Sequence, residues 1–266
     1  AYKIQNFELY LLIKMSQKFK KVIENSKENA ILNNVLQSFG LYVYPKIVTM
    51  LMKNPEITDD AIFRGLAIDE KKSEDSFNKF KLTGVANLVK HIITIKPSTR
   101  ILDFGGANCL AACNLAETYR LRKVDVADVV DRVAPKGVKF TKLEVGKKLP
   151  YTDREFDIVF CMMTLHHIKD VEETIKELHR ICGKWLIIQE HDATDGYADI
   201  LDIVHGMYIF VKNDEDYEKL ENFTDFVAWY RSMTEWDILL KKYFSMRWMK
   251  RTKSAQNNYF ALYEKN

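Results

Sequence analysis

Two glycines and two acidic residues near the middle of the chain have the spacing of a nucleotide-binding turn. A short apolar run ends at Asp103, Gly105 and Gly106 follow it, and a helical pattern begins a few residues later. A strand, a glycine turn and a helix in this order place backbone N–H groups and a helix N-terminus against a nucleotide-like ligand. Asp125 closes the next apolar run about 20 residues on, where a carboxylate can accept hydrogen bonds from both ribose hydroxyls.

A group of acids and an imidazole follows the fifth predicted strand. Glu190, His191 and Asp192 come directly after the apolar run Trp185–Gln189. His191 suits acceptor positioning or proton removal, because an unperturbed imidazole titrates near neutral pH. Alternatively, Glu190 or Asp192 caps the next helix, and the sequence leaves both interpretations open. His205, on an apolar helical run, is either a buried histidine or a further candidate catalytic residue.

Two adjacent histidines, His166 and His167, follow the fourth predicted strand. Neighbours in the chain point to different sides, which makes them a poor pair of metal ligands. We expect one to face the ligand site and the other to pack or hydrogen-bond. The four cysteines also lack the paired spacing of a metal site, so we expect no metal.

The elements that must position these residues change in character along the chain. Residues 1–76 show helical spacing throughout and predict an α-helical N-terminal extension, either a lid or an acceptor platform. In residues 77–266, apolar strands alternate with helices, which predicts a parallel sheet covered by helices on both faces. Residues 193–235 predict a helical insertion, and two strands at 246–249 and 258–263 predict a final hairpin.

Composition excludes some classes of function. The chain has 266 residues, 47% of them hydrophobic, which is typical of a globular protein. Its net charge of only +3 gives no overall positive potential that would attract nucleic acid. Two basic segments with interleaved aromatics, 14–27 and 241–253, are either solvated faces or nucleic-acid contacts. Unpaired cysteines and the lack of a membrane-length apolar run predict a reducing, cytoplasmic location. A chain that begins with Ala1 is also consistent with a piece of a longer protein.

A long run in the second half carries a family resemblance. The sequence LPYTDREFDIVFCMMTLHHIKDVEETIKELHRICGKWLIIQEHD, from Leu149 to Asp192, is similar to the class I S-adenosylmethionine-dependent methyltransferases, in the methyltransferase-11-like group. The strings EHD and DIVHGMY also resemble methyltransferase-like proteins of large DNA viruses. The resemblance implies an α/β, Rossmann-like seven-stranded sheet, with the helical extension before it and the insertion before its last strands. It also implies S-adenosyl-L-methionine as the cofactor.

Residue by residue, the resemblance implies a cofactor site along the ends of the first strands. Two positions where the family has glycine hold Ala107 and Cys109, which predicts a narrower turn. The acid that recognises adenine falls at Val145, with Glu144 beside it, so either Glu144 takes this role or apolar contacts do. The expected cofactor residues are Asp103, Gly105, Gly106, Asn108, Asp125, Val126, Glu144, Val145, Cys161, Met162 and His166.

Three functions agree with these observations. The first, which we prefer from the sequence, is methyl transfer to RNA, including an RNA cap, which the helical extension and basic segments favour. The second is methyl transfer to a small molecule, which the HHI-type motif and the 193–235 insertion favour. The third is a non-catalytic binding subunit, which the missing glycines and adenine acid favour. An oxygen acceptor benefits from a base, and the expected catalytic residues are His191, Asp192 and His205.

Overall fold

The structure is a computed structural model that divides into two compact units. One unit comprises residues 1–75 and 195–214, and the other comprises 76–194 and 215–266. The residues that the structure describes are 21–22, 25–38, 84–194, 197–201, 228–252 and 257–266. Among them, no helix is long and apolar enough to cross a membrane.

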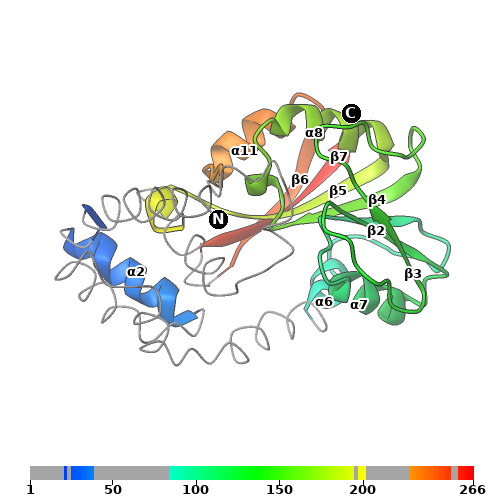
Figure 1. The fold of residues 1–266 in the computed structure, drawn as a ribbon, viewed down its shortest axis with the longest axis horizontal. Helices are drawn as coiled ribbons and strands as arrows, with labels where there is room; N and C mark the ends of the chain where they lie inside the picture. The colour runs from blue at the N-terminus through cyan, green and yellow to red at the C-terminus, as the bar shows by residue number, and fades with distance from the viewer. Residues whose placement is uncertain (1–20, 23–24, 39–83, 195–196, 202–227, 253–256) are drawn as a thin grey trace, which may run out of the picture. The chain divides into compact units, whose positions relative to one another are not determined.

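The first unit contains helix α2 (Ser26–Ser38), coloured blue in Figure 1. Its start is fixed by Asn25, whose side-chain oxygen accepts hydrogen bonds from the backbone N–H groups of Lys27 and Glu28 at 3.1 and 3.3 Å. The amide of Asn25 in turn donates to the Glu28 carboxylate at 3.1 Å. The role of the extension 1–76, as a lid or as an acceptor platform, stays a prediction.

The second unit is built on a seven-stranded sheet with the order β3-β2-β1-β4-β5-β7-β6 (Figure 1). Strands β3, β2, β1, β4 and β5 are parallel, whereas β7 is antiparallel to both β5 and β6. The strands are β1 (Ile101–Phe104), β2 (Val124–Asp128), β3 (Val138–Lys142), β4 (Phe156–Met162), β5 (Cys182–His191), β6 (Phe244–Arg251) and β7 (Asn258–Lys265). This sheet confirms the predicted Rossmann-like class I methyltransferase fold, including the final hairpin.

Helices cover both faces of the sheet, as its central strands require (Figure 1). All four residues of β1 are buried, so apolar side chains point to both faces and each face needs a cover. Helices α6 (Val85–Val89) and α7 (Leu110–Tyr119) pack on one face, against residues such as Ile101 and Val126. Helices α8 (Val171–Ile181) and α11 (Met233–Leu240) lie on the other, against residues such as Leu102.

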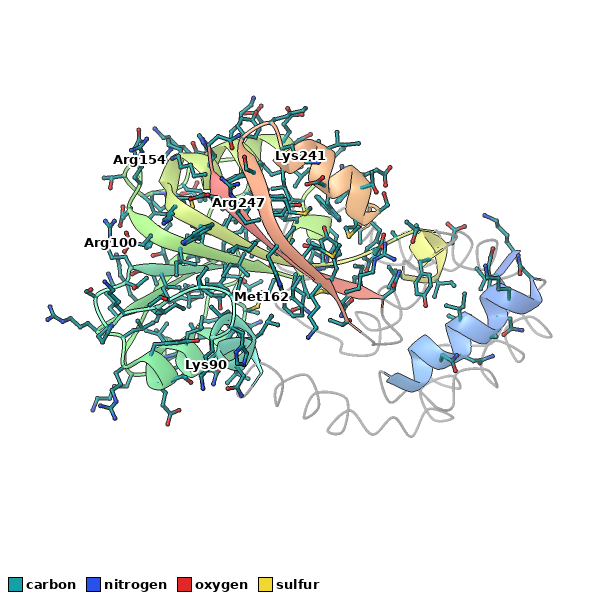
Figure 2. All side chains as sticks on the ribbon, turned by 180° about the vertical axis from the view of Figure 1, so that it is seen from behind. Lys90, Arg100, Arg154, Met162, Lys241 and Arg247 are labelled. Atoms are coloured by element: carbon teal, nitrogen blue, oxygen red, sulfur yellow. The ribbon has the colours of Figure 1, made fainter. Side chains whose placement is uncertain are left out.

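The register of the parallel strands brings their carboxyl ends to one edge of the sheet. Phe104 at the end of β1 is level with Cys161 near the end of β4. In Figure 2, Arg100 and Arg154, which precede β1 and β4, lie together at the amino ends of the strands, and Met162 lies away from them along the sheet. Any ligand site built from strand ends therefore belongs on the Met162 side.

Candidate functional site

The turn after β1 leaves no room for a side chain at Gly105. Its φ is +71°, and a Cβ atom there would lie 2.3 Å from the side chain of Thr164. Its backbone N–H donates to the carbonyl of Ala127 on β2 at 2.7 Å. Glycine is needed at this position for both its backbone conformation and the close approach of Thr164, two residues after β4.

Gly106 packs against the second strand in the same way. A Cβ atom at Gly106 would lie 2.7 Å from Val126 Cγ1 and 2.8 Å from Asp103 Oδ2. Asp103 and Val126 are both buried, so they form the floor beneath the turn. Asn108, by contrast, is exposed at the surface of the turn. The two glycines and the two floor residues are thus brought together, as the sequence predicts.

Ala107 and Cys109 adopt the backbone conformation that glycine would favour. Their φ angles are +43° and +61°, in the left-handed region where a Cβ atom costs about 1–2 kcal/mol per residue. The turn therefore holds backbone strain at both positions, and the predicted narrowing stays a prediction. Cys109 is also the N-cap residue of α7, and its side chain makes no capping hydrogen bond to the helix.

Asp125 does not close the second strand. It is the second residue of β2, level with Leu102 in the middle of β1. Its carboxylate lies 3.1 Å from the ammonium of Lys123 and 3.7 Å from that of Lys139. The predicted position of Asp125 at the end of the strand is therefore wrong, because this residue lies three residues earlier and pairs with lysines. Its ribose contact stays a prediction, which this position does not favour.

The acid at the end of β2 is Asp128, which the sequence analysis missed. Its Oδ2 accepts a hydrogen bond from the backbone N–H of Ala107 at 2.9 Å, and its Oδ1 accepts one from Val130 at 3.0 Å. It thus contacts the glycine turn directly. The sequence does contain a second acid three residues after Asp125. The prediction ended the strand at Asp125, whereas β2 continues to Asp128.

The loop after β3 lies next to the end of β2. The backbone N–H of Leu143 donates to the carbonyl of Asp128 at 2.7 Å, which joins the two strand ends. Glu144 and Val145 follow it and are exposed, Val145 to 66%. Both are thus near the acid of β2, at the place where the adenine contact was predicted, and their part in binding stays a prediction.

The end of β4 is joined to the end of β1 by Thr164. Its hydroxyl donates to the carbonyls of Met162 at 3.0 Å and Phe104 at 3.4 Å. Cys161 is fully buried beneath this junction, and burial raises the pKa of its thiol well above the ordinary value. Met162 is the last residue of β4 and is half-buried. Both residues thus belong to the end of β4 and do not follow the strand, and their contact with the cofactor stays a prediction.

Glu190, near the end of β5, holds the chain segment that follows β4. Its Oε1 accepts hydrogen bonds from the backbone N–H groups of Thr164 at 3.0 Å and Leu165 at 2.7 Å. Its Oε2 lies 2.6 Å from Nδ1 of His166, in the 3₁₀ helix η1 (Leu165–His167). The side chain is fully buried, and this burial raises the pKa of Glu190 to about 7.

His166 lies in a group of four aromatic rings and one carboxylate that we call the histidine cluster. Its members are His166, His167, Glu190, His191 and Tyr230. The ring of His166 stacks on Tyr230 with centroids 4.9 Å apart and an angle of 18°. The centroids of His167 and His191 lie 4.2 and 5.5 Å from that of His166. Burial lowers the pKa of both His166 and His167 well below the ordinary value, so both are neutral at pH 7.

Asp192 anchors neighbouring elements. Its Oδ1 accepts a hydrogen bond from the backbone N–H of Met233 at 2.9 Å, in the first turn of α11. Its Oδ2 lies 2.6 Å from the guanidinium of Arg251 on β6. Its backbone N–H donates to Asn257, and its side chain is fully buried. Asp192 thus holds the start of α11, whose N-cap is Ser232, and in the described part of the chain it is not seen to cap the next helix. Its predicted catalytic role stays a prediction.

Of the other predicted site residues, His191 lies in the described part of the chain and His205 does not. His191 is buried in the histidine cluster, which agrees with its predicted place at the end of β5. His205 and most of the 193–235 insertion lie outside the described residues. Within the described part of the chain, no group of three or more His, Cys, Asp or Glu side chains could hold a metal ion.

Comparisons with known proteins agree with this geometry. Residues 102–184 match the family model described as a methyltransferase domain. An uncharacterized methyltransferase, YcgJ of Bacillus subtilis (strain 168), is 29% identical over 111 residues, which are 38% of this chain and 44% of the relative. The matched region is thus less than half the length of this curated relative.

Two solved structures have the same fold. One is an S-adenosylmethionine-dependent methyltransferase from Aquifex aeolicus, with a TM-score of 0.51, 15% identity, and coverage of 73% of this chain and 96% of the other. The second is a chain in the complex between the Haloferax volcanii Trm112 methyltransferase activator and a methyltransferase. Its TM-score is 0.51, with 11% identity and coverage of 73% and 92%. At these identities, the likeness concerns the fold.

Proposed function

We propose that this chain is a class I S-adenosylmethionine-dependent methyltransferase that transfers a methyl group from that cofactor, as the match of residues 102–184 to a methyltransferase domain supports. The donor would lie at the carboxyl ends of β1, β2 and β4, and the acceptor would approach the ends of β4 and β5. One observation carries the proposal: a glycine turn without room for a Cβ atom is hydrogen-bonded to Asp128 at the end of the next strand.

The residues at the strand ends fit the cofactor. Gly105 and Gly106 let the turn pack closely on Thr164 and Val126, and Asp128 offers a carboxylate to ribose hydroxyls. Cys161 and Met162 border the place of the methionine end. When bound, S-adenosylmethionine supplies a methyl group that its own sulfonium charge already activates. The chain's own task is to align the acceptor and exclude water.

An RNA acceptor, including a cap, is supported by the basic segments 14–27 and 241–253. Most of the first segment lies outside the described residues. In the second segment, four basic residues have carboxylate partners, which reduces the net positive charge along β6. The pairs are Lys241–Asp237, Lys242–Glu172, Arg247–Glu264 and Arg251–Asp192.

A small-molecule acceptor is supported by the histidine cluster. Glu190, His166 and His191 are buried at the end of β5, each with less than 5% of its surface exposed. A few polar groups placed within an otherwise apolar environment are typical of sites for small ligands. This observation makes a small molecule the acceptor class that the described residues favour, with RNA as the second candidate.

Non-catalytic binding is the third alternative. It is supported by the two missing glycines and by the missing adenine acid, whereas the positive φ angles of Ala107 and Cys109 weaken the first of these arguments. We also propose a reducing, cytoplasmic location, which is supported by four free cysteines.

Two measurements test these alternatives. Calorimetry of the full chain with S-adenosylmethionine should give a binding isotherm, and no heat at high micromolar ligand would refute both enzyme proposals. Incubation with cofactor labelled in its methyl group should then label a protein-free small-molecule extract more than total or capped RNA. Label in RNA alone would favour the RNA acceptor, and binding without any labelled product would favour the non-catalytic subunit.

A further inference from the structure

Positive charge is concentrated in one short segment of the chain. Residues 120–148 contain nine lysines or arginines and four acidic residues, which gives this segment a net charge of +5. The rest of the chain has 31 basic and 33 acidic residues, a net charge of −2. The small net charge of the whole chain therefore includes one strongly basic segment, whose local potential differs from that of the rest.

This segment forms one edge of the sheet, which we call the β3 edge and define as residues 120–148. Within the described part of the chain, β3 is the outermost strand and pairs with β2 alone (Figure 1). The loops 129–137 and 143–155, on either side of β3, contain no helix, and no residue of β3 is fully buried. Strand β3 and its loops therefore present their charged side chains to solvent.

Six basic side chains of the β3 edge are exposed and have no carboxylate partner among the described residues, and we call them the edge cations. The amino-end group precedes β2 or β3, and the carboxyl-end group lies at the end of β3 and in the loop after it. The amino-end group is Arg120, Arg122 and Lys136, and the carboxyl-end group is Lys142, Lys147 and Lys148. Lys123 and Lys139 are not included, because both lie near the carboxylate of Asp125.

The two groups of edge cations are separated by the length of β3. Val124 of β2 is level with Val138 of β3, and Asp128 is level with Lys142, so the two strands run side by side from one group to the other. A strand rises about 3.3 Å per residue, which places the groups about 13 Å apart along the edge. The edge cations are therefore spread along the sheet and do not converge on one point.

The loop after β3 presents the carboxyl-end group beside the proposed donor site. The backbone N–H of Leu143 donates to the carbonyl of Asp128 at 2.7 Å, and that of Leu149 donates to the carboxylate of Glu177 at 3.0 Å. Both leucines are buried, whereas residues 144–148 between them are all exposed. The loop is thus held at both ends, and the lysines between these ends face solvent near the end of β2.

We propose that the β3 edge binds the phosphate backbone of single-stranded RNA, with the edge cations as its phosphate contacts. The inference goes beyond methyl transfer, because it concerns binding and holds whether the methyl acceptor is a nucleotide or a small molecule. The surface is also distinct from the basic segments 14–27 and 241–253.

The spread of the edge cations fits a chain of phosphates better than it fits one small anion. A small ligand is bound where a few polar groups converge on it, and these two groups do not converge. Lysines and arginines that neutralise successive phosphates release condensed counterions, and this gain needs no enclosed pocket. Phosphates of one strand follow at intervals of about 3.4 Å along a helix axis, so the length of β3 corresponds to about four of them.

Apolar side chains near the edge cations favour a single strand over a duplex. Val133, in the loop before β3, is 96% exposed, and Val145, in the loop after it, is 66% exposed. Phe140, in β3 between the two groups, is half-buried. Unstacked bases of a single strand contact such side chains, whereas the bases of a duplex are stacked inside it.

Two other roles account for the edge cations less well. Lysines on an edge strand prevent pairing with another sheet, but Lys142 is the only edge cation within β3 itself. A membrane surface also attracts basic segments, but helices that lie on membranes bury side chains such as Trp, Phe or Leu. Within residues 120–148, all of which are described, the exposed large apolar side chains are Val133 and Val145.

Fluorescence anisotropy of a labelled single-stranded RNA of mixed sequence tests the surface, with the full chain and no cofactor. Two edge variants each replace all three cations of one group by glutamine. A control variant removes the same charge at the opposite edge of the sheet, in β6 and just before it, from residues that pair with carboxylates. The control combines Lys241→Gln, Lys242→Gln and Arg247→Gln, two of which are labelled in Figure 2.

Each edge variant should bind RNA more weakly than the natural chain. One phosphate contact adds about 0.7 to the slope of log K against log salt for a single strand, which is roughly fivefold in affinity between 1 M and 0.1 M salt. Loss of three contacts should therefore raise Kd by up to about 10²-fold at 0.1 M salt and lower the slope by about 2, whereas the control should change Kd less than about threefold. No RNA binding by the natural chain, unchanged binding in either edge variant, or an equal loss in the control would overturn the proposal.

Acetylation of lysines in the natural chain gives a second readout, which does not depend on how well a variant folds. After reaction with an N-hydroxysuccinimide ester of acetate, mass spectrometry reports which lysines bound RNA protects. Protection should cover the four lysines of the edge cations and spare two at the other edge: Lys136, Lys142, Lys147 and Lys148, against Lys241 and Lys242. Equal protection of both sets, or protection of the second set alone, would overturn the proposal.

The same acetylation experiment distinguishes RNA from other polyanions. Phosphatidylserine vesicles and polyglutamate replace RNA as probes for a membrane and for an acidic protein. Protection of the edge lysines by either probe but not by RNA would overturn the proposal. Neither readout involves the cofactor, so a failure of the proposed methyl transfer would leave both results interpretable.

Discussion

Replacing two acids of one strand, Asp128 and Asp125, distinguishes the acid at the end of β2 from the one inside it. Asp128→Asn keeps the size of the side chain but removes its charge and one acceptor oxygen. In the structure the two oxygens of Asp128 accept from Ala107 and Val130. Asp125→Asn is the matched control, because it makes the same change three residues earlier, where the carboxylate pairs with Lys123.

The expected loss of affinity follows from the bonds to ribose. Hydrogen bonds to a charged group contribute about 1.5–3 kcal/mol each, and the asparagine of Asp128→Asn retains one neutral acceptor. We therefore expect a loss of about 2–3 kcal/mol, which corresponds to a roughly 30- to 150-fold higher Kd. For Asp125→Asn the lost partners are lysines whose side chains are 52% and 56% exposed. Such pairs contribute at most about 1 kcal/mol to the free energy of unfolding. Their loss should leave the affinity for the ligand unchanged.

Calorimetry with S-adenosylhomocysteine on both variants gives the two affinities. Thermal unfolding without ligand measures separately how far Asp128→Asn loosens the turn through Ala107. The reasoning is refuted if Asp125→Asn weakens binding tenfold or more while Asp128→Asn leaves it unchanged, since the ribose contact would then come from the middle of the strand.

Three further substitutions test the turn and its surroundings. Ala107→Gly should stabilise the chain by about 0.5–1 kcal/mol in urea unfolding, because relief of left-handed strain exceeds the added chain entropy; a lower midpoint would contradict this. Gly105→Ala should abolish S-adenosylhomocysteine binding, because the new Cβ atom clashes with Thr164. Gly146→Ala is its control: the φ of Gly146 is +72° but the space around it is open, so this variant should lose only about 1 kcal/mol of stability. Asp192→Asn should lower the free energy of unfolding by about 1–3 kcal/mol but leave turnover of the folded protein unchanged, and a specific loss of turnover would restore its catalytic role.

The part of the site that depends on local sequence was predictable. Gly105 and Gly106 lie between an apolar run and a helical pattern. These flanking patterns are enough to predict that the turn requires glycine. The positions of Ala107 and Cys109 were also identified, although their consequence was not. A sequence shows that glycine is missing, but only the backbone angles show that Ala107 and Cys109 adopt the left-handed conformation at a cost in strain.

The part that depends on distant pairing was not predictable. Asp125 and Asp128 are both acids after apolar residues, and the choice between them depends on where β2 ends, which its register with β1 decides. The contact between Glu190 and His166 joins residues 24 apart in sequence. It exists because β4 and β5 pair in parallel and β5 extends past the end of β4, so that Glu190 reaches the backbone of η1.

Thr164 connects the donor half of the proposed site to the acceptor half. Its side chain is the reason that Gly105 cannot carry a Cβ atom, and its hydroxyl bonds to Phe104 at the end of β1. Its backbone N–H is held by Glu190, the same carboxylate that faces His166. A rigid link of this kind fixes the distance between the glycine turn and the histidine cluster. Methyl transfer needs such alignment, because a displacement of about 1 Å can cost roughly 10²-fold in rate.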